Sequence, residues 1–181
     1  MQNIIFSDID GVLNDNTSCL CPEIISNFKD LVKENDAKVV LITSRQGFGT
    51  KNIRIRIIDE MRQIGISNVD FVDPNFEGDL LGIPIPARVL GIIDYLKNNK
   101  DCNYVILDDE YHNDYKLLCL NFYKTSMNQG LRNSDLIHIS LKKVNMNNFK
   151  NVNYYYRQLG EVEQTYNNLI KVLKKVYDNK K

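Results

Sequence analysis

The chain has 181 residues, of which 43% are hydrophobic and 25% are charged, which is typical of one soluble globular domain with a substantial core. Basic and acidic residues are equal in number, at 23 each, so net charge gives no support for a general nucleic-acid or membrane binder. No apolar run approaches the roughly 18 residues of a membrane-spanning helix, and the first residues lack the features of a signal peptide.

The first part of the chain alternates short apolar strands with amphipathic helices. Residues 3–7 form an apolar run that predicts a buried strand. Pro22 then opens a helix over about 23–35, where the missing N–H of proline is not needed. Residues 37–43 predict a second buried strand, and apolar spacing over 51–64 predicts a second helix.

The middle of the chain continues this pattern after a proline-rich interruption. Residues 69–72 predict a third strand, whereas 73–86 hold three of the four prolines and predict an irregular excursion. Apolar residues at helical spacing predict a helix over 87–99, in which Gly91 is a weak point. Residues 103–107 predict a fourth strand.

The last part of the chain is less regular. Residues 118–125 predict a fifth strand, and apolar spacing predicts a helix over about 159–177. Alternating strands and helices predict a three-layer α/β/α, Rossmann-like fold with a parallel sheet. We expect a single domain over 1–181, with its core in 3–138 and a helical extension over about 139–181.

Polar side chains follow three of the predicted strands at the point where each strand ends. Ligands of such folds bind outside the carboxyl ends of the strands, so we expect these side chains to lie together. Several carboxylates at one edge need a cation to offset their repulsion. The residues concerned are Asp8, Asp10, Thr43, Ser44, Arg45, Asp108 and Asp109.

This set of residues suits phosphoryl transfer, in which a carboxylate can act as nucleophile and form an aspartyl-phosphate. Asp8 is the candidate nucleophile. Asp10 is placed to protonate the leaving oxygen and then to deprotonate water, and Gly11 gives the backbone the freedom that a turn there needs. Thr43 is the candidate donor to a phosphoryl oxygen, and Arg88 is the candidate cation that stabilises the phosphoryl group and the carboxylates.

The same carboxylates predict a Mg²⁺ site, because Mg²⁺ prefers one or two carboxylates together with water and phosphate. Asp8 and one of Asp108 and Asp109 would supply carboxylates, and the main-chain carbonyl of Asp10 would be a third ligand. Of the adjacent pair we favour Asp109 as the direct ligand, with Asp108 acting through water.

Each of these residues also has an ordinary structural interpretation as a helix cap, a turn residue, a strand-end hydroxyl or a surface ion pair. Ser44 is an alternative to Thr43. Arg45 suits a substrate contact and a structural salt bridge equally well, and Asp114 suits a second acidic support and a plain turn residue equally well. Four cysteines without a CxxC pair or a histidine at zinc-ligand spacing predict reduced thiols in a cytoplasmic protein.

The order of these motifs resembles the haloacid dehalogenase (HAD) superfamily of phosphatases, and most closely the HAD domains of Swiss Army Knife RNA repair-like proteins. The resemblance covers about residues 3–138. It rests on DIDGVLN (8–14), LITSR (41–45), the helix led by Arg88 in RVLGIIDYL, VILDD (105–109) and the late pair Gly130-Leu131.

This resemblance implies a Mg²⁺-dependent phosphomonoesterase with little or no cap domain, since the segment after Asp10 is too short for a large one. An open site of that kind would admit a bulky substrate such as a polynucleotide end, although a small phosphorylated molecule also fits. A phosphatase subunit of an RNA repair system and a non-catalytic phosphate- or metal-binding module are the alternatives. The sequence indicates no membrane association and no obligatory protein partner.

Overall fold

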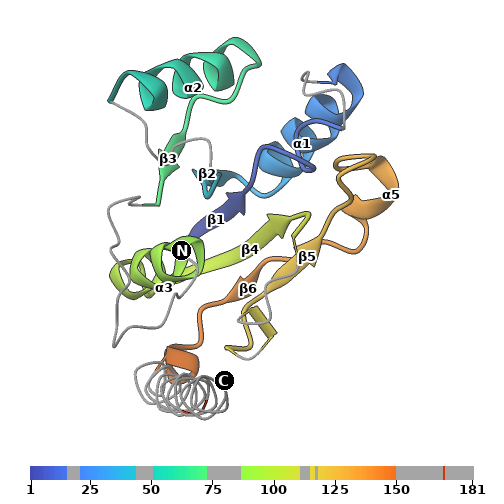
Figure 1. Cartoon of the computed structure of the whole chain (residues 1–181). Helices are drawn as coiled ribbons and strands as arrows, with labels where there is room; N and C mark the ends of the chain where they lie inside the picture. The colour runs from blue at the N-terminus through green and yellow to red at the C-terminus, as the bar shows by residue number, and fades with distance from the viewer. Residues whose placement is uncertain are drawn as a thin grey trace, which may run out of the picture.

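A computed structural model of the chain describes most of its length and shows a central sheet with helices packed around it (Figure 1). The described residues are 1–15, 21–43, 51–72, 87–110, 115–116, 118–149 and position 169. The predicted excursion over 73–86 lies outside them, as does all but one position of the predicted C-terminal helix.

Six strands of the described residues form one sheet in the order β3-β2-β1-β4-β5, with β6 paired to β4. All neighbours within the ordered five are parallel. The strands are β1 (Gln2–Ser7), β2 (Ala37–Leu41), β3 (Val69–Phe71), β4 (Cys102–Asp108), β5 (Phe122–Lys124) and β6 (Lys142–Lys143).

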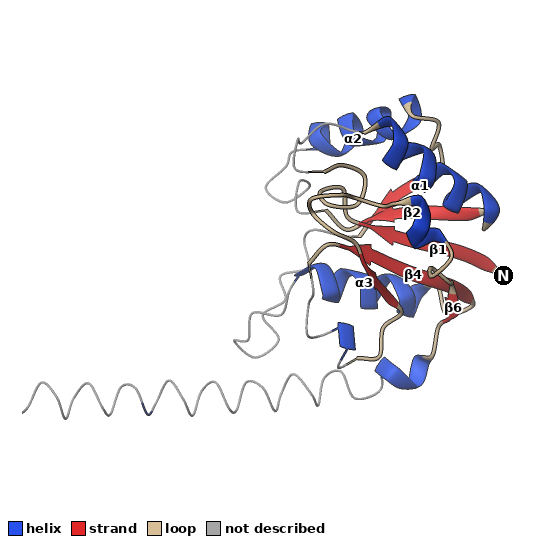
Figure 2. Ribbon diagram, turned by 90° about the vertical axis from the view of Figure 1, so that its right-hand side faces the viewer, coloured by secondary structure: helices blue, strands red, loops and turns tan. Residues whose placement is uncertain are grey.

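Helices cover both faces of this sheet, so the predicted three-layer α/β/α architecture is confirmed. Figure 2 shows α1 and α2 on one face and α3 on the other. The helices are α1 (Pro22–Glu34), α2 (Lys51–Gln63), α3 (Ala87–Asn98) and the short α5 (Asn133–Leu136), followed by a 3-10 turn, η2 (Met146–Phe149). None of the described helices is long and apolar enough to cross a membrane.

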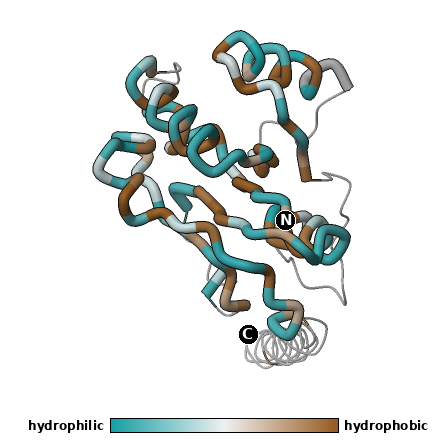
Figure 3. The backbone as a smooth tube through the Cα atoms, turned by 180° about the vertical axis from the view of Figure 1, so that it is seen from behind, coloured by the Kyte–Doolittle hydropathy of each residue, from teal (hydrophilic) through white to brown (hydrophobic). Residues whose placement is uncertain are grey.

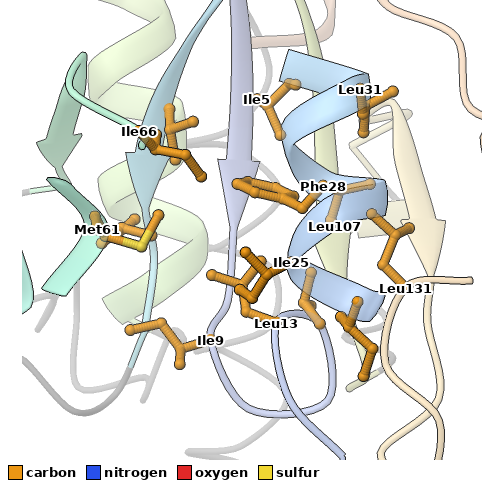
Figure 4. Close-up of a cluster of buried hydrophobic side chains, with 14 of the residues drawn as sticks. Ile5, Ile9, Leu13, Ile25, Phe28, Leu31, Met61, Ile66, Leu107 and Leu131 are labelled. Atoms are coloured by element: carbon orange, nitrogen blue, oxygen red, sulfur yellow. The ribbon is translucent and has the colours of Figure 1, made fainter. Parts of the chain in front are cut away.

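Alternation along the strands divides the buried side chains into two cores, one on each face. In β1, Ile5 points to the α1 and α2 face, whereas Ile4 and Phe6 point to the α3 face. Phe28 of α1 is fully buried, and Figure 4 shows it pointing toward the sheet near Ile5. Along each helix hydrophobic and hydrophilic residues alternate, as expected for helices that bury one face (Figure 3).

The strand order locates the crevice where a ligand binds in a fold of this kind. The chain runs outward from β1 through β2 to β3, and then returns to the other side of β1 to form β4. The carboxyl ends of β1 and β4 therefore flank the point at which the direction of winding reverses, which is where open α/β sheets bind ligands.

One expectation about the end of the sheet is wrong. The predicted strand over 118–125 is only Phe122–Lys124, because Cys119 adopts a positive φ of 50° in a turn where its N–H donates to the Lys116 carbonyl. The apolar run arises because Leu118 and Leu120 enter the core from this turn.

The sheet is mostly parallel, as predicted, and among the described residues one antiparallel pairing joins β6 to β4. Two buried residues, Val144 and Phe149, follow β6 and pack into the core on the α3 face. Residues 142–149 therefore join the folded core, although the sequence placed them in a helical extension. Of the cysteines, Cys21, Cys102 and Cys119 are free thiols, and Cys19 lies outside the described residues.

Gly91 of α3 allows the helix to approach the end of β3 closely. A Cβ at this position would lie 2.9 Å from the Cβ of Val72, which is 2% exposed. We expect Gly91→Ala to lower the free energy of unfolding by up to about 2 kcal/mol, because an overpacking cost of about 1–3 kcal/mol is offset by a gain of about 1 kcal/mol in helix propensity. Urea denaturation measures the change.

Val72→Gly is the matched background for this substitution, because it removes the Val72 Cβ at 2.9 Å and the two methyl groups that lie 3.2 and 3.6 Å from the position that the new carbon would occupy. In that background we expect a smaller cost for Gly91→Ala. An equal cost in both backgrounds would contradict the close-approach explanation.

Candidate functional site

Four of the predicted site residues lie at the carboxyl edge of the sheet, on adjacent strands. Asp8 follows β1 directly, and its N–H donates to the Leu107 carbonyl at 3.0 Å. Because Ser7 pairs in register with Leu107, Asp8 lies beside Asp108, the last residue of β4, and Asp109 comes next. Thr43 follows β2, whose neighbour is β1.

The side chains of Asp8, Asp108 and Asp109 form an acidic cluster. One carboxylate oxygen from each lies within 4.8 Å of the others. Asp8 is 4% exposed and Asp108 is fully buried. Like charges in a buried site of low dielectric constant repel strongly unless a cation is present. Oxygen donors at this spacing suit a small divalent cation.

Arg88 bridges two members of the acidic cluster with one nitrogen. Its Nη1 lies 3.0 Å from Asp8 Oδ2 and 2.7 Å from Asp108 Oδ2. The guanidinium reaches the cluster from the first turn of α3, on the opposite face of the sheet from α1. Among the described residues, the three carboxylates of the cluster and this guanidinium together carry a net charge of −2 when all are ionised. One divalent cation would neutralise that charge.

The pKa values of Asp8, Arg88 and Asp109 are all raised, but for different reasons. Burial raises the pKa of Asp8 above its ordinary value, and the negative charge of Asp108 adds to the rise, against the effect of Arg88. Although burial acts to lower it, the pKa of Arg88 is raised by the carboxylates of Asp8 and Asp108, so this residue stays charged. Burial and Asp108 also raise the pKa of Asp109.

The adjacent aspartates differ in what surrounds their carboxylates. Asp108 Oδ2 accepts hydrogen bonds from Arg88 and from the hydroxyl of Tyr115, at 2.7 and 3.0 Å, and its Oδ1 accepts the N–H of Glu110 at 3.0 Å. Asp109 is only partly buried, and the one hydrogen bond that acts on its pKa comes from its own backbone N–H. Asp108 is thus held in place by protein donors, whereas Asp109 is the more available ligand.

A tight turn after β1 brings Gly11 against Asp109. The Ile9 carbonyl accepts the N–H groups of Val12 and Leu13 at 3.3 and 2.9 Å, and Gly11 has a φ of +68°, so the predicted turn is confirmed. A Cβ on Gly11 would lie 2.5 Å from the Cβ of Asp109. Glycine is needed here for its backbone conformation and for the close approach.

Asp10 is not one of the three residues of the acidic cluster, and its Oδ1 accepts a hydrogen bond from Asn14 Nδ2 at 2.9 Å. Thr43 is 1% exposed, and its hydroxyl hydrogen-bonds the Asp8 carboxylate, which acts to lower the pKa of Asp8. Ser44, Arg45 and Asp114, the remaining candidates, lie outside the described residues.

Three residues of the site were missed by the sequence interpretation. Tyr115 and Thr125 are buried; Tyr115 bonds the carboxylate of Asp108, and the Thr125 N–H donates to its carbonyl at 3.0 Å. Asn14 ends the quoted DIDGVLN motif, which was a usable signal for that residue. Neither Tyr115 nor Thr125 has a sequence signal, because only the folded sheet brings them to Asp108.

Gly11→Ala is expected to destabilise the fold and to displace Asp109. We expect the free energy of unfolding to fall by about 1–3 kcal/mol, from positive-φ strain and overpacking. We also expect added Mg²⁺ to raise the melting temperature of wild type but not of this variant, because a displaced carboxylate binds a divalent cation less well. Thermal unfolding with and without MgCl₂ measures both effects.

Gly65→Ala is the matched control, because Gly65 also has a positive φ, of +88°. The nearest atoms to its added carbon belong to the flexible end of Lys29, at 3.3 and 3.4 Å. We expect this variant to lose stability but to keep the rise caused by Mg²⁺. Loss of that rise in both variants would show that strain alone explains the effect of Gly11→Ala.

Because the pKa of Asp8 is raised, ionisation of its carboxyl is predicted to destabilise the metal-free protein, so stability should depend on pH. A carboxyl whose folded-state pKa is raised contributes most stability below its unfolded-state pKa, about 3.9, and loses that contribution as pH rises through the folded-state pKa. Asp8→Asn removes this titration. The melting temperature of the variant relative to wild type, measured in EDTA, should therefore increase from acidic to neutral pH, and a constant difference would contradict the prediction.

A family model described as the HAD domain in Swiss Army Knife RNA repair proteins matches residues 4–136. No curated protein and no solved structure is significantly similar to the chain. The match spans both flanking helix layers and the strands that carry Asp8, Asp108 and Asp109. The chain therefore belongs to the HAD domains of Swiss Army Knife RNA repair proteins.

Proposed function

We propose that the chain is a Mg²⁺-dependent phosphomonoester hydrolase that acts through an aspartyl-phosphate on Asp8. Membership of the HAD family suggests a hydrolase. The observation that carries the proposal is the meeting of three carboxylates within 4.8 Å at the carboxyl edge of the sheet, with Arg88 between Asp8 and Asp108.

In the first half of the proposed reaction, the Asp8 carboxylate attacks the phosphorus of a phosphomonoester. An oxygen–phosphorus bond to Asp8 forms while the bond between phosphorus and the leaving oxygen breaks. Asp10 gives its proton to that oxygen, so the product leaves as an alcohol. The N–H of Ile9 donates to Asp8 Oδ1 at 2.7 Å and, with Arg88, fixes the orientation of the nucleophile.

In the second half, a water molecule attacks the phosphorus of the aspartyl-phosphate. Asp10, now a carboxylate, takes a proton from that water as the new oxygen–phosphorus bond forms. The bond between phosphorus and Asp8 breaks, which restores the Asp8 carboxylate and releases inorganic phosphate. Asp10 is protonated again, so the residues return to their starting state.

Asp8 and Asp109 are the proposed direct carboxylate ligands of Mg²⁺, together with the main-chain carbonyl of Asp10. Asp108 then acts through water and holds Arg88, in keeping with the donors that surround its carboxylate. Bound Mg²⁺ would offset the negative charge of the carboxylates and of the phosphoryl group. Arg88 and the hydroxyl of Thr43 are the protein groups placed beside the nucleophile to stabilise that charge.

The proposed substrate is a phosphorylated polynucleotide end or another bulky phosphomonoester. Two observations support it: the family is described from RNA repair proteins, and the segment between Asp10 and Pro22 is too short to hold a cap domain. Oligonucleotides with a 3′-phosphate, oligonucleotides with a 5′-phosphate, and small sugar phosphates are the substrates to compare. Preference for the small molecules would indicate a metabolic role instead.

Asp8→Asn tests the proposed nucleophile. We expect wild type to hydrolyse p-nitrophenyl phosphate with MgCl₂ and to lose activity in EDTA, and the variant to lose on the order of 10²-fold or more in kcat. Asp59→Asn is the matched control, because Asp59 is an exposed residue of α2 whose partner is Arg62.

The outcomes separate the proposed enzyme from its main alternative. Full activity in Asp8→Asn would rule out the nucleophile. A wild type that is stabilised by Mg²⁺ but hydrolyses none of the phosphate esters would favour a non-catalytic phosphate- or metal-binding module.

A further inference from the structure

The side chain of Asn14 bonds both Asp10 and the residue that follows it, Gly11. Asn14 is 1% exposed. The Gly11 N–H donates to Asn14 Oδ1 at 2.9 Å, and Asn14 Nδ2 donates to Asp10 Oδ1, also at 2.9 Å. One buried amide thus connects the positive-φ glycine of the turn to the carboxyl of the proposed acid and base.

The chemistry of these two contacts sets the orientation of the amide. A backbone N–H can only donate, so the contact with Gly11 requires the carbonyl oxygen of Asn14 on that side. The NH₂ group must then face Asp10. A carboxyl oxygen that accepts such a hydrogen bond behaves as the carbonyl oxygen of the acid, which leaves the other oxygen, Oδ2, as the one that carries the proton.

The backbone around Asn14 is held by the segment after β5, so the amide cannot easily move away from Asp10. The Thr125 hydroxyl donates to the Gly11 carbonyl at 2.6 Å, and the Leu131 N–H donates to the Val12 carbonyl at 2.9 Å. Gly130, with a φ of +57°, lies so close that a Cβ there would be 2.9 Å from the main-chain carbonyl oxygen of Asn14. The late Gly130-Leu131 pair thus supports the turn that carries Asp10.

We propose that Asn14 is the positioning residue of the acid–base step, an inference that rests on the proposed phosphatase function. It holds Oδ1 of Asp10, so that the proton passes from Oδ2 to the leaving oxygen as the bond between that oxygen and phosphorus breaks. In the second half, Oδ2 takes the proton of the attacking water as the bond between phosphorus and Asp8 breaks. Asn14 itself touches neither substrate nor phosphorus.

The test is the dependence of kcat/KM on the acidity of the leaving group. An acidic leaving group such as p-nitrophenol departs without protonation, whereas phenol and glycerol increasingly need a proton. For Asn14→Ala we expect a loss of about 10-fold or more with glycerol phosphate, an intermediate loss with phenyl phosphate, and a loss within about threefold with p-nitrophenyl phosphate.

Asn27→Ala is the matched control, because Asn27 is also a buried asparagine that supports the segment after β5. Its Nδ2 donates to the Leu131 carbonyl at 3.0 Å, whereas the amide of Asn14 bonds Asp10 itself. We expect this variant to lower the melting temperature and to change kcat/KM by a similar factor for all three esters. The same uniform pattern in Asn14→Ala would overturn the positioning role.

Asn14→Asp is a second variant that keeps the shape of the side chain and the acceptor for the Gly11 N–H, but replaces the donor to Asp10 by an oxygen. We expect the same selective loss with poor leaving groups, and a uniform or absent loss would also overturn the proposal. If wild type hydrolyses neither the three esters nor a phosphorylated oligonucleotide, the phosphatase function itself fails. An active wild type with uniform losses defeats only the role of Asn14.

Discussion

The arrangement of the site depends on burying carboxylates next to one another at the junction of β1 and β4. Asp8 and Asp108 are almost fully buried, where charges are weakly screened and repel strongly. Arg88 contacts both through a single nitrogen, and it comes from the helix layer on the α3 face. The cluster is therefore stable only when the sheet and α3 are assembled together, which links formation of the site to formation of the fold.

A second constraint is the turn that leaves β1. It must reverse direction within a few residues and still allow Asp109 to approach, and only glycine fits at position 11. Besides the hydrogen bonds within the turn, Thr125 and Leu131 support it from the segment that follows β5, on the far side of β4. An acid or base that must be aligned within a fraction of an ångström benefits from such external support.

The strands and long helices were predictable because burial of one face imposes a regular spacing on their apolar residues. The strands ending at Asp8 and Asp108 and the helix beginning before Arg88 follow from local patterns of apolar residues. The failures lie where long-range contacts override local preference. The run over 118–120 is apolar but turns at Cys119. The helix α5 has four residues and is stabilised by Asp135, which accepts hydrogen bonds from the Arg132 N–H and from the Tyr123 hydroxyl. No periodicity could show an element that short.

The sequence by itself determined the fold class and the positions of the acidic residues, because motifs at strand ends must share one edge of a parallel sheet. Only the tertiary structure decided how the acidic residues are divided between roles. Asp108 is surrounded by protein donors and Asp109 is not, and Asp10 faces Asn14 and lies outside the acidic cluster. These differences arise from contacts among segments far apart in the chain. Packing sets the geometry of those contacts, and the spacing of residues in a motif carries no information about packing.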